Sequence, residues 1–134
     1  MLKINELDYY VPISSVKNKH YKMKDGIDFM KITQGTRILG VLNLNNMIPI
    51  NSKNVNLLNY SEIDKYRIFN SDHEKSLYIS FLNLELKLIN QNIDKIKSNA
   101  TKLYNEKIKN PSSKISKRCC EFKLLEEKCI DYNR

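Results

Sequence analysis

Glycine is scarce in this chain, with only three residues among 134. A phosphate-cradling loop and a dinucleotide-binding fingerprint both need several glycines at fixed spacing, so neither is encoded here. The sequence also has no HExxH motif and no paired-carboxylate signature. These absences exclude the common nucleotide-binding loops and the zinc-protease type of site.

Cysteine and histidine are equally sparse. The three cysteines are Cys119, Cys120 and Cys129, an odd number with an adjacent pair, which is not typical of a secreted disulfide framework. No CxxC pair occurs, and His20 and His73 lie far from the cysteines in sequence, so no zinc site is indicated. We therefore expect no metal and no cofactor, and we interpret both histidines as solvated surface rings.

Long hydrophobic runs are missing as well. No apolar segment reaches the length needed to span a bilayer, and the opening MLKINELDYY does not have the pattern of a signal peptide. We expect a cytoplasmic protein with no membrane partner. The length of 134 residues and the 41% hydrophobic content predict a single domain, residues 1–134, with its own core.

Acidic residues are fewer than basic ones: 15 Asp and Glu stand against 23 Lys and Arg, giving a formal net charge of +8. A basic balance favours anionic partners such as nucleic acid. A chain rich in Lys, Asn and Ile also arises from AT-rich coding sequence. Charge alone therefore leaves open a basic structural domain without a nucleic-acid ligand.

The first half of the chain is typical of short strands. Residues 7–14 form one predicted strand with Leu7, Tyr9, Val11 and Ile13 on one face. A basic loop over 16–26 follows. DFMKIT and RILGVL then predict a hairpin around Gln34-Gly35, where glycine allows a positive φ. In MIPI, Pro49 cannot donate to a ladder and should lie at a sheet edge or strand end.

The second half changes to helical spacing. Apolar residues recur at Leu77, Phe81, Leu84 and Leu88, and charged residues that include Glu85 are placed away from this stripe. Ser71 or Asp72 is predicted to cap this helix, and Asn90-Gln91-Asn92 is predicted to interrupt it. After the interruption, Pro111-Ser112-Ser113 predicts a loop and Glu121–Ile130 a last helix. Strands followed by helices predict an α+β fold with a mainly antiparallel sheet.

The clearest chemical signal is the end of the first strand, in YYVPISSVKNKH. Ser14 and Ser15 offer hydroxyls for a phosphate oxygen, and Lys17 offers a positive charge. Basic residues mixed with a ring follow, which can engage phosphates and stack on unpaired bases: Lys19, His20, Tyr21, Lys22 and Lys24. This set suits RNA cleavage by the RNA's own 2′-hydroxyl, which needs alignment, proton transfer and stabilisation of the phosphorane but no metal. The alternative is a strand end that runs into a solvated lysine-rich loop.

Four blocks, in order, resemble the ToxN/AbiQ family of endoribonuclease toxins from type III toxin–antitoxin systems. YYVPISSVKNKH resembles the family's strand ending in Thr/Ser-Ser-Pro-Lys, and GVLNLNNMIPI resembles its strand pair ending in Met-Ile-Pro-Ile. VNLLNY and KLLEEKCIDY resemble the segment after that pair and the C-terminal helix. By position, Ser14 stands where the family usually has Thr, Ser15 and Lys17 match, and Val16 replaces the proline.

The resemblance implies a twisted SH3-like sheet, as in the MazF and Kid toxins, packed with C-terminal helices. It also implies a metal-independent ribonuclease that cuts single-stranded A-rich cellular or phage mRNA to leave a 2′,3′-cyclic phosphate, in phage defence by abortive infection. The implied partner is a repetitive antitoxin RNA of pseudoknots, which inhibits the toxin in a closed protein–RNA hetero-oligomer. Ser14, Ser15 and Lys17 would then be catalytic, and the basic loop would bind RNA.

The start of the chain departs from the family pattern. Family members carry a first strand and loop that contribute a Tyr and a Lys, and we expect MLKINELD not to supply these elements. The following strand would then have an unpaired edge, and the protein would be less active and less stable than one begun further upstream. Two interpretations of the short start are open, a misplaced start codon and a truncated gene. A catalytically impaired remnant that only binds antitoxin RNA is the alternative function.

Overall fold

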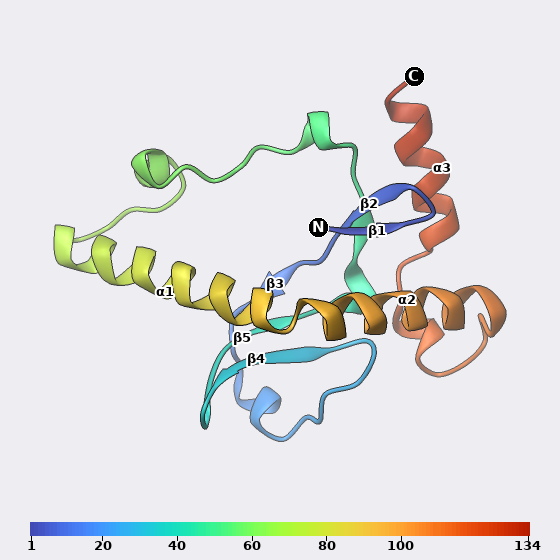
Figure 1. The fold of residues 1–134 in the computed structure, drawn as a ribbon, viewed down its shortest axis with the longest axis horizontal. Helices are drawn as coiled ribbons and strands as arrows, with labels where there is room; N and C mark the ends of the chain where they lie inside the picture. The colour runs from blue at the N-terminus through green and yellow to red at the C-terminus, as the bar shows by residue number, and fades with distance from the viewer.

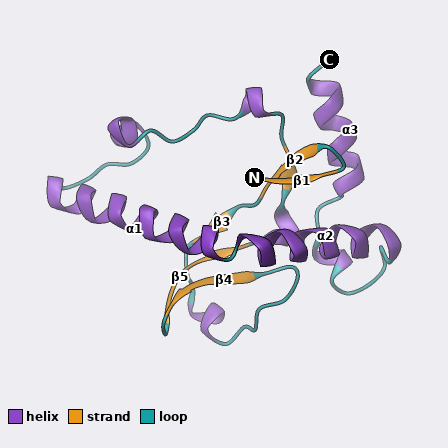
Figure 2. Ribbon diagram, viewed as in Figure 1, coloured by secondary structure: helices purple, strands orange, loops and turns teal.

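The computed structural model describes all residues 1–134 and combines short strands with long helices (Figure 2). The strands are β1 (Leu2–Ile4), β2 (Leu7–Tyr10), β3 (Ile13–Ser14), β4 (Met30–Gln34), β5 (Arg37–Leu42) and β6 (Ile48–Pro49). The helices are α1 (Asp72–Gln91), α2 (Ile93–Lys109) and α3 (Phe122–Tyr132). All strand pairs are antiparallel, so the predicted mixture of helices and antiparallel strands is confirmed.

The strands form two three-stranded sheets, in the orders β1-β2-β6 and β3-β5-β4. The single strand predicted over 7–14 is wrong, because β2 ends at Tyr10 and β3 begins at Ile13. Pro12, between them, has no N–H to continue a ladder. Ile13, expected on the buried face, is 46% exposed. The two halves of the predicted strand therefore belong to different sheets.

The expectation of an unpaired strand edge near the start of the chain is also wrong, because the first residues form a strand. Leu2–Ile4 forms β1, which pairs with β2 in the register Leu2↔Tyr9 and Ile4↔Leu7. Asn5 and Glu6 make the connecting turn with φ of 51° and 64°, the signature of a tight hairpin turn whose two central residues are left-handed. With β1 on one side and β6 on the other, β2 has no unpaired edge.

The second hairpin is confirmed. Strands β4 and β5 pair from Met30↔Leu42 to Gln34↔Arg37, and Gly35 in the turn has a φ of +60°. Pro49 is confirmed at an edge, since β6 is the outer strand of its sheet and Pro49 its last residue.

Helices α1 and α2 lie almost end to end and run along the sheets (Figure 1). Ser71 caps α1, as predicted: its Oγ accepts a hydrogen bond from the Glu74 N–H (3.1 Å), and the Glu74 carboxylate accepts one from the Asn70 N–H (2.8 Å). The predicted interruption is confirmed at Asn92, whose side-chain amide donates to the Leu88 carbonyl (2.8 Å).

The buried face of α1 is rotated around the helix axis by about one residue relative to the predicted apolar stripe. Phe81, Leu84 and Leu88 pack against the core, as predicted, but Leu77 is 58% exposed. Glu85, expected on the outer face, is instead the buried residue of this helix. The prediction counted apolar residues only, so it assigned the carboxylate to solvent.

Residues 50–71 connect β6 to α1 in a long arc with short 3₁₀ turns (Figure 1). Leu57 and Ile68 are exposed in this connection, whereas Ile63 is buried. The Tyr60 hydroxyl donates a hydrogen bond to Asn83 of α1 (2.9 Å). Asp64 pairs with Lys75 of α1, and Asn54 donates a hydrogen bond to Asn133 (2.8 Å), so the segment is held mainly by polar side chains at the surface.

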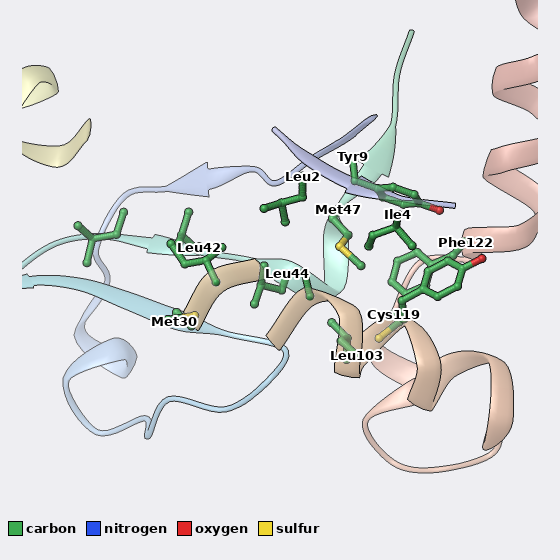
Figure 3. Close-up of a cluster of buried hydrophobic side chains, with 14 of the residues drawn as sticks. Leu2, Ile4, Tyr9, Met30, Leu42, Leu44, Met47, Leu103, Cys119 and Phe122 are labelled. Atoms are coloured by element: carbon green, nitrogen blue, oxygen red, sulfur yellow. The ribbon is translucent and has the colours of Figure 1, made fainter. Parts of the chain in front are cut away.

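The core lies where the two sheets meet α2 and α3 (Figure 3). Leu2 and Ile4 of β1 pack with Leu103 of α2 and Phe122 of α3, and the chain between β5 and β6 adds Met47. Burying a leucine or phenylalanine side chain is worth roughly 1.5–3 kcal/mol, so this cluster supplies much of the folding free energy.

One polar group lies inside this apolar cluster. The hydroxyls of Tyr9 and Tyr104 both donate to Glu126 Oε1, each at 2.8 Å, and Asn5 donates to the Tyr104 oxygen (2.7 Å). Lys123 lies 3.6 Å from Glu126 Oε2. Burial raises the pKa of Tyr9 and that of Tyr104, so both phenols stay protonated as donors.

The three cysteines are free thiols, and burial raises the pKa of Cys119 to about 11. No helix is both long enough and apolar enough to cross a bilayer.

We predict that Glu126→Ala lowers the free energy of unfolding by roughly 2–4 kcal/mol, because it leaves two buried phenol hydroxyls without an acceptor. Urea unfolding monitored by circular dichroism measures the change. Glu127→Ala is the matched control, since Glu127 lies on the same helix but is exposed and unpaired, and it should change stability by less than about 0.5 kcal/mol. Equal effects of the two substitutions would contradict the role of Glu126.

Candidate nucleic-acid interface

Ser14 is held in place by the neighbouring strand. It pairs with Val41 across β3 and β5, and its Oγ accepts a hydrogen bond from the Asn43 side-chain amide (3.0 Å). The Asn43 backbone N–H in turn donates to the Pro12 carbonyl (3.1 Å). Because Asn43 occupies a lone pair of the Ser14 oxygen, the Ser14 hydroxyl hydrogen stays available to an acceptor such as a phosphate oxygen.

Lys17 begins a compact turn built around His20. The Lys17 N–H donates to His20 Nδ1 (2.8 Å), and the His20 N–H donates back to the Lys17 carbonyl (2.9 Å). The His20 ring stacks on Phe29, with 5.6 Å between centroids, and is 5% exposed. The interpretation of His20 as a solvated ring is therefore wrong. Burial, and then the charges of Lys19 and Lys17, lower the pKa of His20, which favours the neutral ring whose Nδ1 can accept.

The lysines of this loop are exposed, and none of them belongs to an ion pair: Lys17, Lys19, Lys22 and Lys24. Tyr21 is exposed beside them. Unpaired lysines on one loop are free to contact a polyanion, and an exposed ring can stack on a base.

A groove of approximately 550 Å³ begins at the two serines. The strand end from Ile13 to Val16 forms one wall, and residues of α1 together with Arg67 from the preceding connection form the other. Ser14 and Ser15 are thus brought together with groups from the second half of the chain. Lys17 does not line the groove but follows Val16 directly.

Arg67 is fixed over aromatic rings at this groove. Its guanidinium carbon lies 4.2 Å from the centroid of the Tyr78 ring and 5.7 Å from that of Phe69. Stacking of this kind holds a guanidinium in place while leaving its N–H groups available to an anion. Sequence reasoning missed Arg67, because an arginine in an irregular segment has no periodic signal.

Glu85 lies on the α1 side of the groove and is 9% exposed. No hydrogen-bond donor or cation is paired with its carboxylate, and burial alone raises the pKa of Glu85. Its Oε2 lies only 2.6 Å from the point that a Cβ at Gly40 would occupy, so the glycine in β5 makes room for it. A lone glycine inside the apolar run RILGVL is the sequence signal that indicates such a close approach.

No three His, Cys, Asp or Glu side chains come together in an arrangement that could hold a metal ion. The polar groups of the groove are hydroxyls, a guanidinium and one carboxyl. Such groups can hold a phosphate and move a proton.

Comparison with known proteins finds relatives of one kind by sequence and by structure. A curated endoribonuclease ToxN from Bacillus thuringiensis subsp. kurstaki is 29% identical over 135 residues, covering 97% of this chain and 64% of the relative. This chain therefore spans slightly less than two thirds of the relative's length.

Two solved structures share the fold. One, from a study of selective toxin inhibition by a non-coding RNA pseudoknot, matches 98% of this chain and 76% of its own with a TM-score of 0.76 and 25% identity. The other, from a study of a processed non-coding RNA that regulates a bacterial antiviral system, has a TM-score of 0.76 and 28% identity, covering 99% of this chain and 76% of its own.

The family model described as "Toxin ToxN, type III toxin-antitoxin system" matches residues 1–129. That match covers both sheets, the groove and most of α3. The chain belongs to the ToxN family of toxins from type III toxin–antitoxin systems.

Proposed function

We propose that this chain is an endoribonuclease toxin that cleaves single-stranded A-rich RNA without a metal ion. The observation that supports it most directly is the groove that joins Ser14 and Ser15 to Arg67, next to a loop of unpaired lysines. The curated relative carries the name endoribonuclease. The preference for A-rich sites and the SH3-like relation of the sheets rest on the family resemblance.

The proposed reaction is attack of the RNA 2′-hydroxyl on the adjacent phosphorus, which releases the 5′-oxygen and leaves a 2′,3′-cyclic phosphate. Ser14 and Ser15 orient the scissile phosphate by donating hydrogen bonds to its oxygens. Lys17 stabilises the charge that develops on the phosphorane, as a positioned cation does for an oxyanion. Asn43 positions Ser14, because its amide hydrogen bond sets the direction of the serine hydroxyl.

In this proposal the basic loop binds the RNA on either side of the scissile phosphate. Lys19, Lys22 and Lys24 contact backbone phosphates, and Tyr21 stacks on an unpaired base. The nearly complete burial of the His20 ring gives it a different task within the RNA-binding loop, since its hydrogen bond to the Lys17 N–H shapes the turn that presents the lysines.

The proposed partner is an antitoxin RNA of repeated pseudoknots that inhibits the toxin in a closed protein–RNA assembly. A pseudoknot inhibitor is named for one structural relative and an antiviral system for the other, and we extend both to this chain. Phage or cellular mRNA would be the target once the antitoxin is lost.

The test is incubation of the purified protein with a single-stranded A-rich RNA in the presence of EDTA. Cleavage that leaves a 2′,3′-cyclic phosphate supports the proposal. Salt-sensitive binding without cleavage would instead favour an RNA-binding remnant that sequesters antitoxin RNA. Absence of both binding and cleavage would leave a basic structural domain.

We predict that Lys17→Ala lowers the single-turnover cleavage rate on the order of 100-fold or more at saturating RNA, because it removes a cation from the transition state. Growth inhibition on expression should be lost with it, and the circular dichroism spectrum should not change, since Lys17 is exposed. Lys19→Ala is the matched control: it should weaken RNA binding while leaving the saturated rate nearly intact. A wild-type rate for a folded Lys17→Ala protein would contradict the role.

We also predict that the RNA affinity of the basic loop depends on salt in proportion to its charges. Lys22→Gln should reduce the slope of log K against log salt concentration by about 0.7, the value for one phosphate contact on a single strand. Fluorescence anisotropy with labelled RNA gives the slope. Lys128→Gln, an exposed lysine on α3, should leave it unchanged. Identical slopes for Lys22→Gln and the wild type would place the RNA elsewhere on the protein.

A further inference from the structure

The groove contains one ionisable group to which the proposed reaction so far gives no task, the carboxyl of Glu85. It is nine-tenths buried, and no donor or cation is paired with it. Burying an ionised carboxylate without a partner disfavours the folded state. Glu126 shows the opposite arrangement in the same protein, with two phenol donors on one oxygen. Folding stability therefore does not explain why a carboxylate lies at position 85.

The position of this carboxyl is fixed by the backbone around it. Its Oε2 lies against Gly40 of β5, and the carbonyl oxygen of Ser14 borders the same point, 3.4 Å from where a Gly40 Cβ would lie. The Glu85 carboxyl is thus placed beside the β3–β5 pair that carries the two serines, with an open groove on its other side.

We infer that Glu85 is the general base of the RNA cleavage proposed above, an inference that depends on that function. In this step the 2′-hydroxyl proton passes to the Glu85 carboxylate as the 2′-oxygen forms its bond to phosphorus. The bond from phosphorus to the 5′-oxygen breaks, and the 5′-oxygen takes a proton from water. Glu85 then returns its proton to solvent, and no redox change occurs.

The other ionisable groups near the groove are unsuited to this task. Lys17 and Arg67 are cations, the Tyr78 ring lies beneath the Arg67 guanidinium, and the Nδ1 of His20 is already hydrogen-bonded within its turn. Glu85 is the carboxyl that lines the groove. Burial raises its pKa, which brings a carboxylate closer to the basicity that suits a general base near neutral pH.

The charged environment of Glu85 is simple. Arg67 from the connection and Tyr78 from its own helix are the other ionisable groups of the groove, and the lining residues of β3 and β5 carry no charge. The raised pKa has desolvation as its single cause. If the cleavage rate falls at low pH (the acid limb of the pH profile), substitution of Glu85 can therefore show whether this group causes the fall.

The experiment measures single-turnover cleavage of a saturating single-stranded A-rich RNA in EDTA, over a pH series that extends below and above neutrality. The wild-type rate should rise with pH and then level off as Glu85 ionises. Glu85→Gln should be slower by roughly 100-fold or more and should lose this rise, while RNA affinity is retained. Glu127→Gln is the control, an exposed glutamate that should match the wild type in both respects.

Thermal unfolding separates a catalytic role from a structural one. A raised folded-state pKa means that the folded protein binds more protons than the unfolded chain in the window between the two pKa values. The stability of the wild type relative to Glu85→Gln should therefore fall as pH rises through that window, and should stay lower above it. A residue needed only for folding would give the reverse, a less stable Glu85→Gln protein.

Each outcome decides the inference. If wild-type protein does not cleave RNA at all, both the proposed function and this inference are overturned. If the wild type cleaves and Glu85→Gln keeps its rate or its acid limb, only the general base is overturned. Should Glu85→Gln fail to fold, Glu85→Asp decides: a reduced rate with the acid limb retained supports the role, and an unchanged rate contradicts it.

Discussion

A single carboxylate oxygen joins three parts of the chain that are far apart in sequence. Glu126 Oε1 of α3 accepts hydrogen bonds from Tyr9 of β2 and from Tyr104 of α2, and the rings of both tyrosines pack with Phe122. The apolar side chains around these rings would tolerate many arrangements, whereas two phenols directed at one oxygen select one. The position of β2, and of the strand that follows it, depends on this contact.

The groove follows from that arrangement. Strand β2 is fixed to the helices, Pro12 ends its ladder, and the chain crosses to the second sheet as β3 with the serines at its end. There the middle of α1 faces the strand end, and Glu85 meets Gly40. The two buried glutamates differ in surroundings: Glu126 accepts hydrogen bonds from two tyrosines, whereas Glu85 has no donor and lies beside an open groove. The first arrangement stabilises the fold, and the second is the one for which we propose a role in catalysis.

Local features of the fold were predictable from the sequence because their causes are local. Gly35 in its turn, Ser71 at its cap and Asn92 at its break each act within a few residues. The prediction failed where distant segments decide the outcome. Strand β1 has only three residues, too few to show an alternating pattern, and it is stabilised by pairing with β2 and packing on α2.

In the candidate site, too, the local motif was predictable and the contacts between distant segments were not. The serines and Lys17 were visible as a contiguous motif, but the second wall of the groove was not. Arg67 belongs to it through contact with Tyr78, and Glu85 through contact with Gly40, and neither contact has a sequence spacing that periodicity can detect. His20 was misassigned because its burial comes from Phe29 in the next strand region rather than from its own neighbours.

The long connection over 50–71 has a consequence for motion. Backbone amide hydrogens exchange with solvent through the opening reaction of lowest free energy that exposes them. Segments with few buried contacts open locally, without global unfolding. This connection is anchored by the buried Ile63, by the Tyr60–Asn83 and Asn54–Asn133 hydrogen bonds, by the Asp64–Lys75 ion pair and by the contacts of Arg67 and Phe69 with Tyr78. Arg67 is the residue that this connection contributes to the groove, while the rest of its wall belongs to α1 and Ser14 belongs to a paired strand. Amides of this connection should therefore exchange faster than those of the paired strand that carries Ser14.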